Sequence, residues 1–310
     1  MPPLPIQETE HGVLIGDVEF VWARNAKEFF FSNSIVVHEP DMLVVDPSAN
    51  FSFFEKIASQ NKVQNVLNTH YHIDHRSLNH LFTHARFLCH ELDKPAILSF
   101  DNYLKYADPN PDSSYVMWLK GIYSSLEIQQ QNIQQTLKGG DYLPCKGVKI
   151  QVLHLPGHTP GHMGLLFEDL STLYISDIDL TPMGPWYANT SSDIEQFLDS
   201  IRRIRDIKVD YYISSHGERV YEPERFLEKL GRFEEAFRKR EERILENLQS
   251  GPKSLEELSE FGIIYKASQL GDPLKRCFQQ QMIQKHLDRM EKEKRIAHAD
   301  GRYFLVSNAP

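Results

Sequence analysis

The sequence has few of the features that mark membrane-spanning or secreted proteins. No apolar run approaches the roughly 18 to 20 residues that cross a bilayer, and residues 1–5 have neither the basic nor the apolar region of a secretory signal. The three cysteines, Cys89, Cys145 and Cys277, lie far apart, with no C-x-x-C pair and no even disulfide framework. We therefore expect a cytoplasmic protein with reduced cysteines and no thiol nucleophile.

An excess of positive charge is also missing. The chain has 34 Lys and Arg against 43 Asp and Glu, a net charge of −9. Residues 1–217 contain 16 basic and 26 acidic side chains, whereas residues 218–310 contain 18 and 17. Neither part is the strongly basic body that binds phosphates non-specifically. We therefore expect a small-molecule substrate, do not favour nucleic acid as a partner, and take net acidity to argue against a polyanionic substrate.

What is present indicates an α/β protein. The 310 residues, 41% hydrophobic and 25% charged, are typical of a globular protein with a catalytic domain of about 200 residues and an appendage. The early part alternates short apolar runs with turn residues, which predicts strands, one helix and a returning strand. The predicted strands cover 13–15, 18–22, 35–37, 43–45 and 63–68, the turn 39–41, and the helix 51–60.

The stretch 68–75 is the strongest candidate for a functional site. Four potential metal ligands, His70, His72, Asp74 and His75, follow directly after an apolar run. If 66–69 ends a strand, residues two apart point the same way, so His70 and His72 can hold one ion while Asp74 and His75 reach a second. Fourteen histidines will cluster in places by chance, but chance does not readily produce His-x-His-x-Asp-His.

Later strands end in the same kinds of residue. Strands are predicted at 148–153, 163–167 and 172–175. A Gly- and Pro-rich segment with His158 and His162 separates the first two, and Asp177 follows the third. A further strand, starting at 211, leads to His216. The polar ends of these strands should converge on one rim of the sheets.

This succession resembles the motifs of the metallo-beta-lactamase superfamily, starting with its HxHxDH signature. The resemblance implies an αβ/βα sandwich with two metal ions at one edge of the sheets. It implies that His70, His72 and His158 bind the first metal, that Asp74, His75 and His216 bind the second, and that Asp177 bridges both. Imidazole and carboxylate ligands without thiolate suit zinc, and also manganese or iron; a diiron redox relative would be expected to have Glu in place of His72.

Several residues near the motifs have open roles. Asp46 stands where the family usually has Asp-x-Gly, so it either supports the metal loop or opens a turn. We interpret His162 as structural, not as a ligand. Trp186 or Tyr187 could form a substrate wall or could be packed loop aromatics.

Three departures from the family pattern affect backbone freedom near the metals. Arg76-Ser77 replaces Gly-Gly after His75, Pro47-Ser48 follows Asp46, and Ser176 replaces Gly before Asp177. We expect metal binding to survive these changes and the pocket to differ in shape.

Two further segments are interpreted as structural and not as parts of the metal site. Residues 77–84 look helical, with His80 and His84 on the surface and not in a metal site. Residues 91–137 read as an aromatic, mostly helical insertion broken at 108–112, with Gln-rich residues at 129–135. We expect the insertion to pack on the domain, although it could be a lid or a homodimer surface.

The composition changes at residue 223. An apolar stripe from Phe226 to Leu248 predicts a long helix, Ser254 should cap a short one, and 278–294 predicts another, followed by a hairpin turning at 300–301. This order resembles the winged-helix module of some beta-lactamase-like proteins, a group that includes a ribonuclease. We predict a catalytic domain at 1–222 and a linker helix with a winged-helix-like domain at 223–310.

Four functions are compatible with these patterns. The leading one is a metal-dependent hydrolase in which a dinuclear site lowers the pKa of water from about 15.7 toward 7, Asp74 helps to aim the resulting hydroxide, and the substrate is a thioester, ester or lactone, as in glyoxalase II-like relatives. The alternatives are an endoribonuclease for single-stranded RNA, a persulfide dioxygenase with one iron, and a ligand sensor. Metal content distinguishes the dioxygenase, with its one iron, from the other functions. Activity on single-stranded RNA that falls steeply with added salt would indicate the ribonuclease.

Overall fold

The computed structural model describes residues 3–23, 31–38, 40–126, 131–217 and 220–306. Glu39 of the predicted turn and residues 129 and 130 of the Gln-rich segment lie outside this part. None of the helices in the described ranges is both long enough and apolar enough to cross a membrane.

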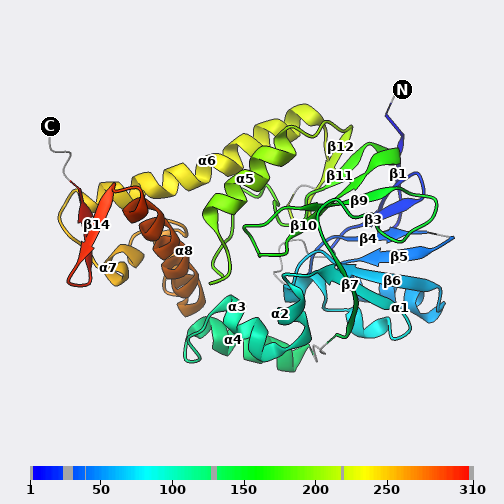
Figure 1. Cartoon of the computed structure of the whole chain (residues 1–310), viewed down its shortest axis with the longest axis horizontal. Coiled ribbons are helices and arrows are strands. Elements are labelled where there is room, and N and C mark those ends of the chain that lie inside the picture. The colour runs from blue at the N-terminus through cyan, green and yellow to red at the C-terminus, as the bar shows by residue number, and fades with distance from the viewer. Residues whose placement is uncertain (1–2, 24–30, 39, 127–130, 218–219, 307–310) are drawn as a thin grey trace.

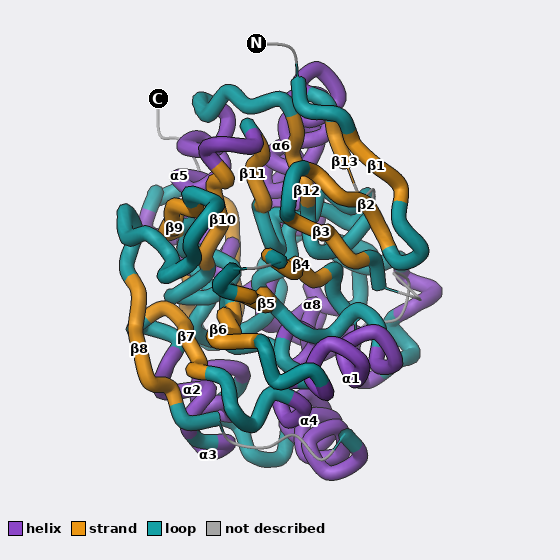
Figure 2. Tube along the Cα trace, turned by 90° about the vertical axis from the view of Figure 1, so that its right-hand side faces the viewer, coloured by secondary structure: helices purple, strands orange, loops and turns teal. Residues whose placement is uncertain are grey.

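Two mixed sheets pack against each other and carry helices on their outer faces (Figures 1 and 2). The first sheet runs in sequence order, antiparallel from β1 to β5 and parallel from β5 to β8. Its strands are β1 (Ile6–Glu8), β2 (Gly12–Ile15), β3 (Val18–Val21), β4 (Ser34–Val37), β5 (Met42–Val45), β6 (Val63–Asn68), β7 (Arg86–His90) and β8 (Ile133–Leu137).

The second sheet has the order β13-β12-β11-β10-β9. Its strands are β9 (Ile150–His154), β10 (Met163–Phe167), β11 (Thr172–Tyr174), β12 (Tyr211–Ile213) and β13 (Val220–Tyr221). β11 and β12 are parallel, and the other pairs are antiparallel. The strands predicted from sequence for the two sheets are confirmed, and β1, β7, β8 and β13 are additions to them.

The side chains of a strand alternate between its two faces, which explains why the strands contribute to two separate cores. In β5, Leu43 and Val45 face the core between the sheets, whereas Val44 faces the core under the helices. Because successive side chains of a strand point to opposite faces, a strand buried on both sides is apolar throughout. The predicted αβ/βα sandwich is therefore confirmed.

The helices of the sandwich begin at side-chain caps in several places. Asn50, Ser99, Ser113 and Asp193 each accept a hydrogen bond from a backbone N–H of the first turn. The helices are α1 (Phe51–Ser59), α2 (Lys94–Leu98), α3 (Phe100–Ala107), α4 (Ser114–Ser125) and α5 (Ile194–Arg205). The insertion is mostly helical and packs on the domain, as predicted, with its last residues forming β8.

The helix predicted at 77–84 is wrong. Only a short 3-10 helix, Asn79–Leu81, is present. The N–H of Leu78 donates to the carbonyl of Pro47, and the Asn79 side chain pairs with that of Asn68. These tertiary hydrogen bonds compete with a regular helix.

The C-terminal part shares a helix with the sandwich. α6 (Pro223–Leu248) contributes Phe226, Phe233 and Phe237 to the sandwich core, and Ile244 and Leu248 to a separate C-terminal cluster. That cluster also includes residues of α7 (Leu255–Ser259), α8 (Pro273–Lys292), β14 (Ile296–Ala299) and β15 (Arg302–Leu305). The boundary between residues 222 and 223 stays a prediction, because one continuous helix serves both cores.

Candidate metal centre

The polar residues at the strand ends meet at one edge of the sandwich. His70, His72, Asp74 and His75 follow β6, His158 lies between β9 and β10, Asp177 follows β11, and His216 follows β12. They form two groups in which one ligand atom from each residue lies within 4.8 Å of the others. The groups are His70, His72, His158 and Asp177, and Asp74, His75 and His216.

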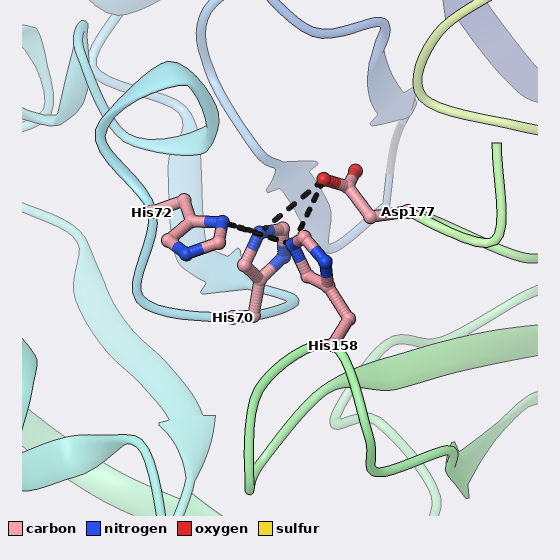
Figure 3. Close-up of side chains that lie close together, drawn as sticks. All are labelled: His70, His72, His158 and Asp177. Carbon is pink, nitrogen blue, oxygen red and sulfur yellow. Dashed lines mark hydrogen bonds and ion pairs between the residues drawn. The ribbon is translucent and has the colours of Figure 1, made fainter. Parts of the chain in front are cut away.

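In the first group, three imidazoles turn nitrogen atoms toward a common point (Figure 3). Nδ1 of His72 lies 2.9 Å from Nε2 of His70 and 2.9 Å from Nε2 of His158. The carboxylate of Asp177 is beside them, with Oδ2 at 3.1 Å from Nε2 of His158. Such crowding of nitrogen lone pairs is favourable when a cation lies between them.

The second group contains the carboxylate of Asp74 and lies next to that of Asp177. Oδ2 of Asp74 lies 3.2 Å from Nε2 of His216 and 3.7 Å from Nε2 of His75. Nε2 of His75 is buried and has no hydrogen-bond partner among the described residues, although Oδ1 of Asp177 is 3.0 Å away. A buried nitrogen without a hydrogen bond is the kind of atom that a metal ion can satisfy.

Asp177 joins the two groups through its two oxygen atoms. Oδ2 lies next to His158 and His70, whereas Oδ1 lies next to His75 and His216. Burial raises the pKa of Asp177, but the surrounding imidazoles outweigh this and hold it well below its usual range. The carboxylate is therefore ionised and shared between both groups.

Neighbouring groups fix the orientation of the imidazole rings. Nδ1 of His158 donates to the carbonyl oxygen of Trp186 at 2.9 Å, and Nδ1 of His75 lies 2.8 Å from Oδ2 of Asp46. Each contact keeps the proton on the outer nitrogen and leaves Nε2 facing the site. For His72 the outer nitrogen is Nε2, which lies 2.6 Å from the side-chain amide of Asn189.

Asp46 supports the metal loop, and the alternative that it only opens a turn is wrong. Besides His75, its carboxylate accepts hydrogen bonds from the backbone N–H and the hydroxyl of Thr69, at 2.8 and 2.6 Å. The carboxylate is completely buried, and burial raises its pKa although His75 and Thr69 oppose the shift.

His162 is placed behind the site, as expected of a structural residue. Its Nδ1 donates to the carbonyl of Leu155, and its Nε2 accepts a hydrogen bond from the backbone N–H of Asp177 at 3.0 Å. Burial, together with the charge of His158, lowers the pKa of His162 to about 3. The neutral ring therefore holds the backbone that carries the bridging carboxylate.

The three departures from the family pattern are accommodated by new contacts. Ser176 adopts a φ of 46°, where glycine is favoured, and its hydroxyl lies 2.9 Å from that of Thr69. The Ser77 hydroxyl donates to that of Ser48 at 3.1 Å. The buried Arg76 donates to the carbonyl of Tyr71 and to the hydroxyl of Tyr123 on α4.

Sequence reasoning missed two supporting residues. Asp93 is completely buried and accepts hydrogen bonds from Tyr71 and Gly161 backbone N–H groups and from the Thr159 hydroxyl, so it ties two loops of the site together. Asn189 contacts His72 and accepts a hydrogen bond from Tyr115. Neither residue belongs to a motif, so no sequence signal pointed to them.

Trp186 and Tyr187, the two aromatic residues considered as a wall of the substrate site, differ in position. The Trp186 ring lies with its centroid 5.7 Å from that of His72 and 5.8 Å from that of His158, so it borders the first group. Tyr187 is fully buried; its hydroxyl contacts Nε2 of His286 and accepts a hydrogen bond from Arg240. The expectation that Tyr187 could form a substrate wall is therefore wrong.

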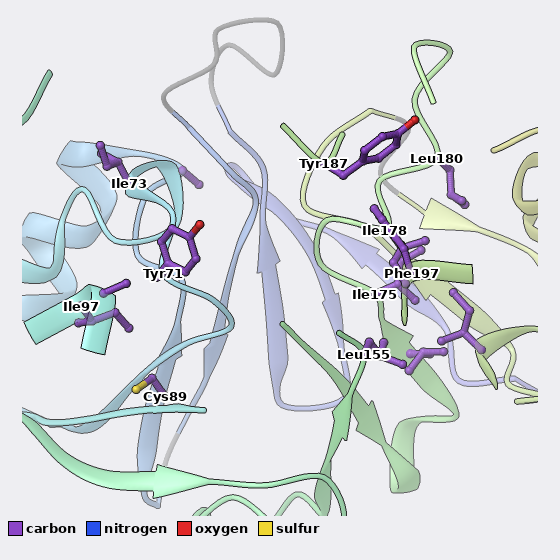
Figure 4. Close-up of a cluster of buried hydrophobic side chains, with 14 of the residues drawn as sticks. Tyr71, Ile73, Cys89, Ile97, Leu155, Ile175, Ile178, Leu180, Tyr187 and Phe197 are labelled. Atoms are coloured by element: carbon purple, nitrogen blue, oxygen red, sulfur yellow. The ribbon is translucent and has the colours of Figure 1, made fainter. Parts of the chain in front are cut away.

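Apolar packing holds the loops of the site from both sides (Figure 4). Tyr71 and Ile73 lie on the side of the first sheet, whereas Leu155, Ile175 and Ile178 lie on the side of the second. The ligand-bearing loops are thus anchored by buried side chains next to each polar residue, which limits the movement of the donor atoms.

The electrostatics favour a bound cation. Burial, reinforced by neighbouring histidines, lowers the pKa of His70 and of His72 well below the ordinary value. Burial also lowers the pKa of His75, but Asp177, Asp46 and Asp74 reverse this and hold it well above the ordinary value. Neutral imidazoles on one side and concentrated negative charge on the other fit divalent ions, so the residues present suit two metals.

An αβ/βα sandwich with a His and Asp cluster at one edge defines a class of metal-dependent hydrolases. Residues 28–216 match the model of the metallo-beta-lactamase superfamily. The chain belongs to this superfamily and is one of its hydrolases.

Relatives and solved structures agree with that assignment. The chain is 25% identical over 208 residues to an N-acyl homoserine lactonase of Bacillus sp, covering 64% of this chain and 73% of the relative. It is 28% identical over 143 residues to a hydroxyacylglutathione hydrolase of Aeromonas salmonicida (strain A449), covering 43% of each.

Two solved structures share the fold over almost the whole chain. A beta-lactamase domain protein from Burkholderia ambifaria has a TM-score of 0.72 at 18% identity, covering 94% of this chain and 92% of that one. A metallo-beta-lactamase family protein from Thermus thermophilus has a TM-score of 0.67 at 21% identity, covering 89% and 94%. The similarity extends through the C-terminal part and concerns the fold alone.

Proposed function

We propose that the chain binds two divalent metal ions, zinc as first choice, and hydrolyses a thioester, an ester or a lactone. The observation that carries this proposal is the convergence of seven side chains in two groups joined by Asp177. The names of two relatives, a homoserine lactonase and a hydroxyacylglutathione hydrolase, support an ester-like bond as the point of cleavage.

Each predicted ligand has a proposed role. His70, His72 and His158 would hold the first ion, Asp74, His75 and His216 the second, and Asp177 both. Imidazole and carboxylate donors without thiolate suit zinc and also iron or manganese; zinc is preferred because His72 stands where a diiron redox relative would be expected to have Glu. Bound there, two such ions would lower the pKa of a water molecule toward neutrality and polarise the bond to be cleaved.

The chain's own groups position the reactants. Asp74 is the second proposed catalytic carboxylate after Asp177, because its side chain is only partly buried and can face a water molecule. Trp186 borders the first group and limits the space in which an acyl group can lie. Asp46, His162 and Asn189 keep the ligand rings and the bridging carboxylate in place.

A single-iron persulfide dioxygenase is less well supported. The second group, with Asp74, His75 and His216 close together, offers a complete set of donors for another ion. For residues 223–310, we propose a winged-helix-like module that adjoins the substrate site, and RNA is not favoured as its partner.

Metal analysis and a substrate panel test this function. We expect two equivalents of metal per chain, and hydrolysis of at least one member of a panel with a glutathione thioester, a lactone and an acyl-CoA. One iron per chain with oxygen consumption on a persulfide would instead establish the dioxygenase. Cleavage of single-stranded RNA with a steep inverse salt dependence, without thioester hydrolysis, would establish the ribonuclease.

A further inference from the structure

A cavity of about 1040 Å³ lies between the sandwich and the C-terminal part. One wall is the loop from Leu180 to Gly184, which begins three residues after Asp177; the others are α6, the segment after α7, and the start of α8. Its volume is at the upper end of the roughly 300 to 1,000 Å³ of small-molecule pockets. A ligand of cofactor size would fit.

The cavity adjoins the metal centre at two places. The ring of Phe278, which lines the cavity, lies 5.2 Å from that of Trp186, and Trp186 borders His72 and His158. On another side, Thr181 lines the cavity, and its methyl group lies 3.3 Å from the position that a Cβ on Gly217 would take. Gly217 directly follows His216. The cavity lining is thus one residue removed from each group, through Trp186 on one side and Gly217 on the other.

The lining of the cavity is strongly basic, unlike the chain as a whole. One face of α6 contributes Lys229, Arg232, Lys239, Arg240 and Arg243, and the opposite wall contributes Lys266 and Lys275. Among the described lining residues, the one carboxylate is Asp272. Lys229, Arg232, Lys239 and Arg243 follow each other at spacings of three, seven and four residues, and Arg240 lies beside Lys239, which places them on one side of the helix.

Arg232, Lys239 and Lys275 form ion pairs with Glu228, Glu235 and Asp272, so the charge of the lining that no carboxylate offsets is concentrated at other residues, Arg240 above all. The Arg240 side chain is buried and donates to the carbonyl oxygens of Met183 and Pro185 and to the Tyr187 hydroxyl. No carboxylate of the described residues forms an ion pair with Arg240, Arg243 or Lys266. A buried guanidinium without a counter-ion is costly unless an anion accompanies it.

Aromatic and aliphatic groups lie among these cations. Phe233 and Ala236 occupy the middle of the basic face of α6, and Trp118, Tyr265 and Phe278 face them. An occupant must therefore combine an apolar or aromatic body with several negative charges. Guanidinium groups match the geometry of phosphate oxygens, so phosphates are the anions that this lining favours.

We propose that the cavity binds the phosphate-bearing carrier group of an acyl thioester or ester whose acyl carbon lies at the metal centre. This proposal rests on the hydrolase function and specifies its substrate class. In the reaction, the oxygen of water bonds to the acyl carbon and the carbon–sulfur bond breaks. The products are the carboxylic acid and the free thiol, which takes up the remaining proton of water.

Three thioesters of one acyl group test the proposal on the metal-loaded, full-length chain. The carriers are coenzyme A, with three phosphates, glutathione, with carboxylates, and uncharged N-acetylcysteamine. We expect kcat/KM to be highest for the coenzyme A thioester and to fall with added salt. Equal kcat/KM for the coenzyme A and N-acetylcysteamine thioesters would overturn the proposal.

Charge reversal in the lining gives the matched comparison. Lys239→Glu and Lys266→Glu should each raise KM for the coenzyme A thioester about fivefold, with kcat and the N-acetylcysteamine kinetics unchanged. Arg238→Glu, on α6 but outside the cavity lining, should leave all of these values unchanged. An unchanged KM for the coenzyme A thioester in the Lys239→Glu/Lys266→Glu double variant would contradict the proposal.

Binding measurements separate failure of the cavity proposal from failure of the hydrolase function. If no thioester is hydrolysed, the hydrolase function fails, and calorimetry with free coenzyme A then judges the cavity. Binding that is lost in the Lys239→Glu/Lys266→Glu variant supports the cavity proposal. If coenzyme A does not bind the wild-type protein, the proposal is overturned. It is also overturned if single-stranded RNA binds more tightly than coenzyme A and the Lys239→Glu/Lys266→Glu variant abolishes that RNA binding.

Discussion

Oδ2 of Asp46 lies 2.8 Å from Nδ1 of His75, and both side chains are completely buried. The carboxylate follows β5, the imidazole follows β6, and these parallel neighbouring strands bring them together. The contact keeps the proton of His75 on Nδ1 and turns Nε2 toward Asp177. Asp46, which is not one of the proposed metal ligands, thereby determines the orientation of His75, which we expect to bind a metal ion.

Asp46→Asn should weaken metal binding in the second group. The amide lacks the negative charge that favours a cation, and its NH₂ group would face Thr69 or His75, where the carboxylate accepts hydrogen bonds. Affinity for the second ion should fall about 10- to 100-fold, measured by competition with a chromophoric chelator. Asp41→Asn, at the other end of β5, is the control, and full retention of both ions in Asp46→Asn would contradict this role.

Asp177→Ala should remove both metals and the activity together. Its two oxygens serve the two groups, so no replacement donor remains for either. His72→Ala, by contrast, should affect mainly the first ion. Elemental analysis after dialysis distinguishes the two patterns, with the exposed Asp169→Ala as control. Full activity in Asp177→Ala would rule out the bridging role.

Glu241 should make the stability of the chain depend on acid pH. It is buried between α6 and α8 and pairs with Arg289 and Arg295, at 2.6 and 2.5 Å, and with His286. Burial opposes its ionisation, but these partners prevail and lower its pKa from 4.5 to about 2. Because the folded-state pKa is lowered, the stabilisation is present above pH 4.5 and is lost as pH falls toward 2.

Glu241→Gln tests this linkage. At neutral pH the variant should lose on the order of 2 kcal/mol of unfolding free energy, and the difference from wild type should shrink between pH 4.5 and 2. Urea denaturation at several pH values measures both effects. Glu242→Gln, at the exposed neighbouring position that pairs with Arg238, is the control. A pH-independent difference for Glu241→Gln would mean that ionisation is not involved.

Gly184→Ala should destabilise the loop that lines the cavity. Gly184 has a φ of 79°, and an added Cβ would lie 2.7 Å from Cβ of Ala236 on α6. Strain and overlap together should cost about 2 to 3 kcal/mol, measured by chemical denaturation. Gly301→Ala has a similar φ of 74° in open space and reports the strain alone. Ala236→Gly in the Gly184→Ala background should restore only the part of the stability that is lost through overlap with Cβ of Ala236. If Gly184→Ala and Gly301→Ala cost the same unfolding free energy, the close approach of residue 184 to Ala236 would be excluded.

The strand and helix pattern was readable from local sequence because apolar alternation and capping residues act over a few residues. His70, His72 and Asp74 follow an apolar run, and Asn50 and Ser254 cap helices where the pattern requires them. The helix predicted at 77–84 failed for the opposite reason. There, hydrogen bonds to Pro47 and Asn68, distant in sequence, outweigh local preference.

Net charge was a poor guide to the local charge of the cavity. Residues 218–310 are nearly neutral by count, yet α6 places five basic residues, Lys229, Arg232, Lys239, Arg240 and Arg243, along one cavity. A count cannot see this separation, because it depends on which face of the helix packs against the sandwich. The argument against a polyanionic substrate rested on that count alone.

The sequence by itself determined the fold class and the identity of the seven clustered residues, because strand periodicity and motif spacing are local properties. Only the tertiary structure decided that Asp46, Asp93, Asn189 and His162 hold those residues, and that Tyr187 points away. Supporting contacts join segments that are far apart in the chain, such as Asp46 with His75 and His72 with Asn189. The first contact follows from the pairing of β5 with β6 within one sheet, and the second from the folding of a distant loop onto the site, so neither leaves a local pattern in the sequence.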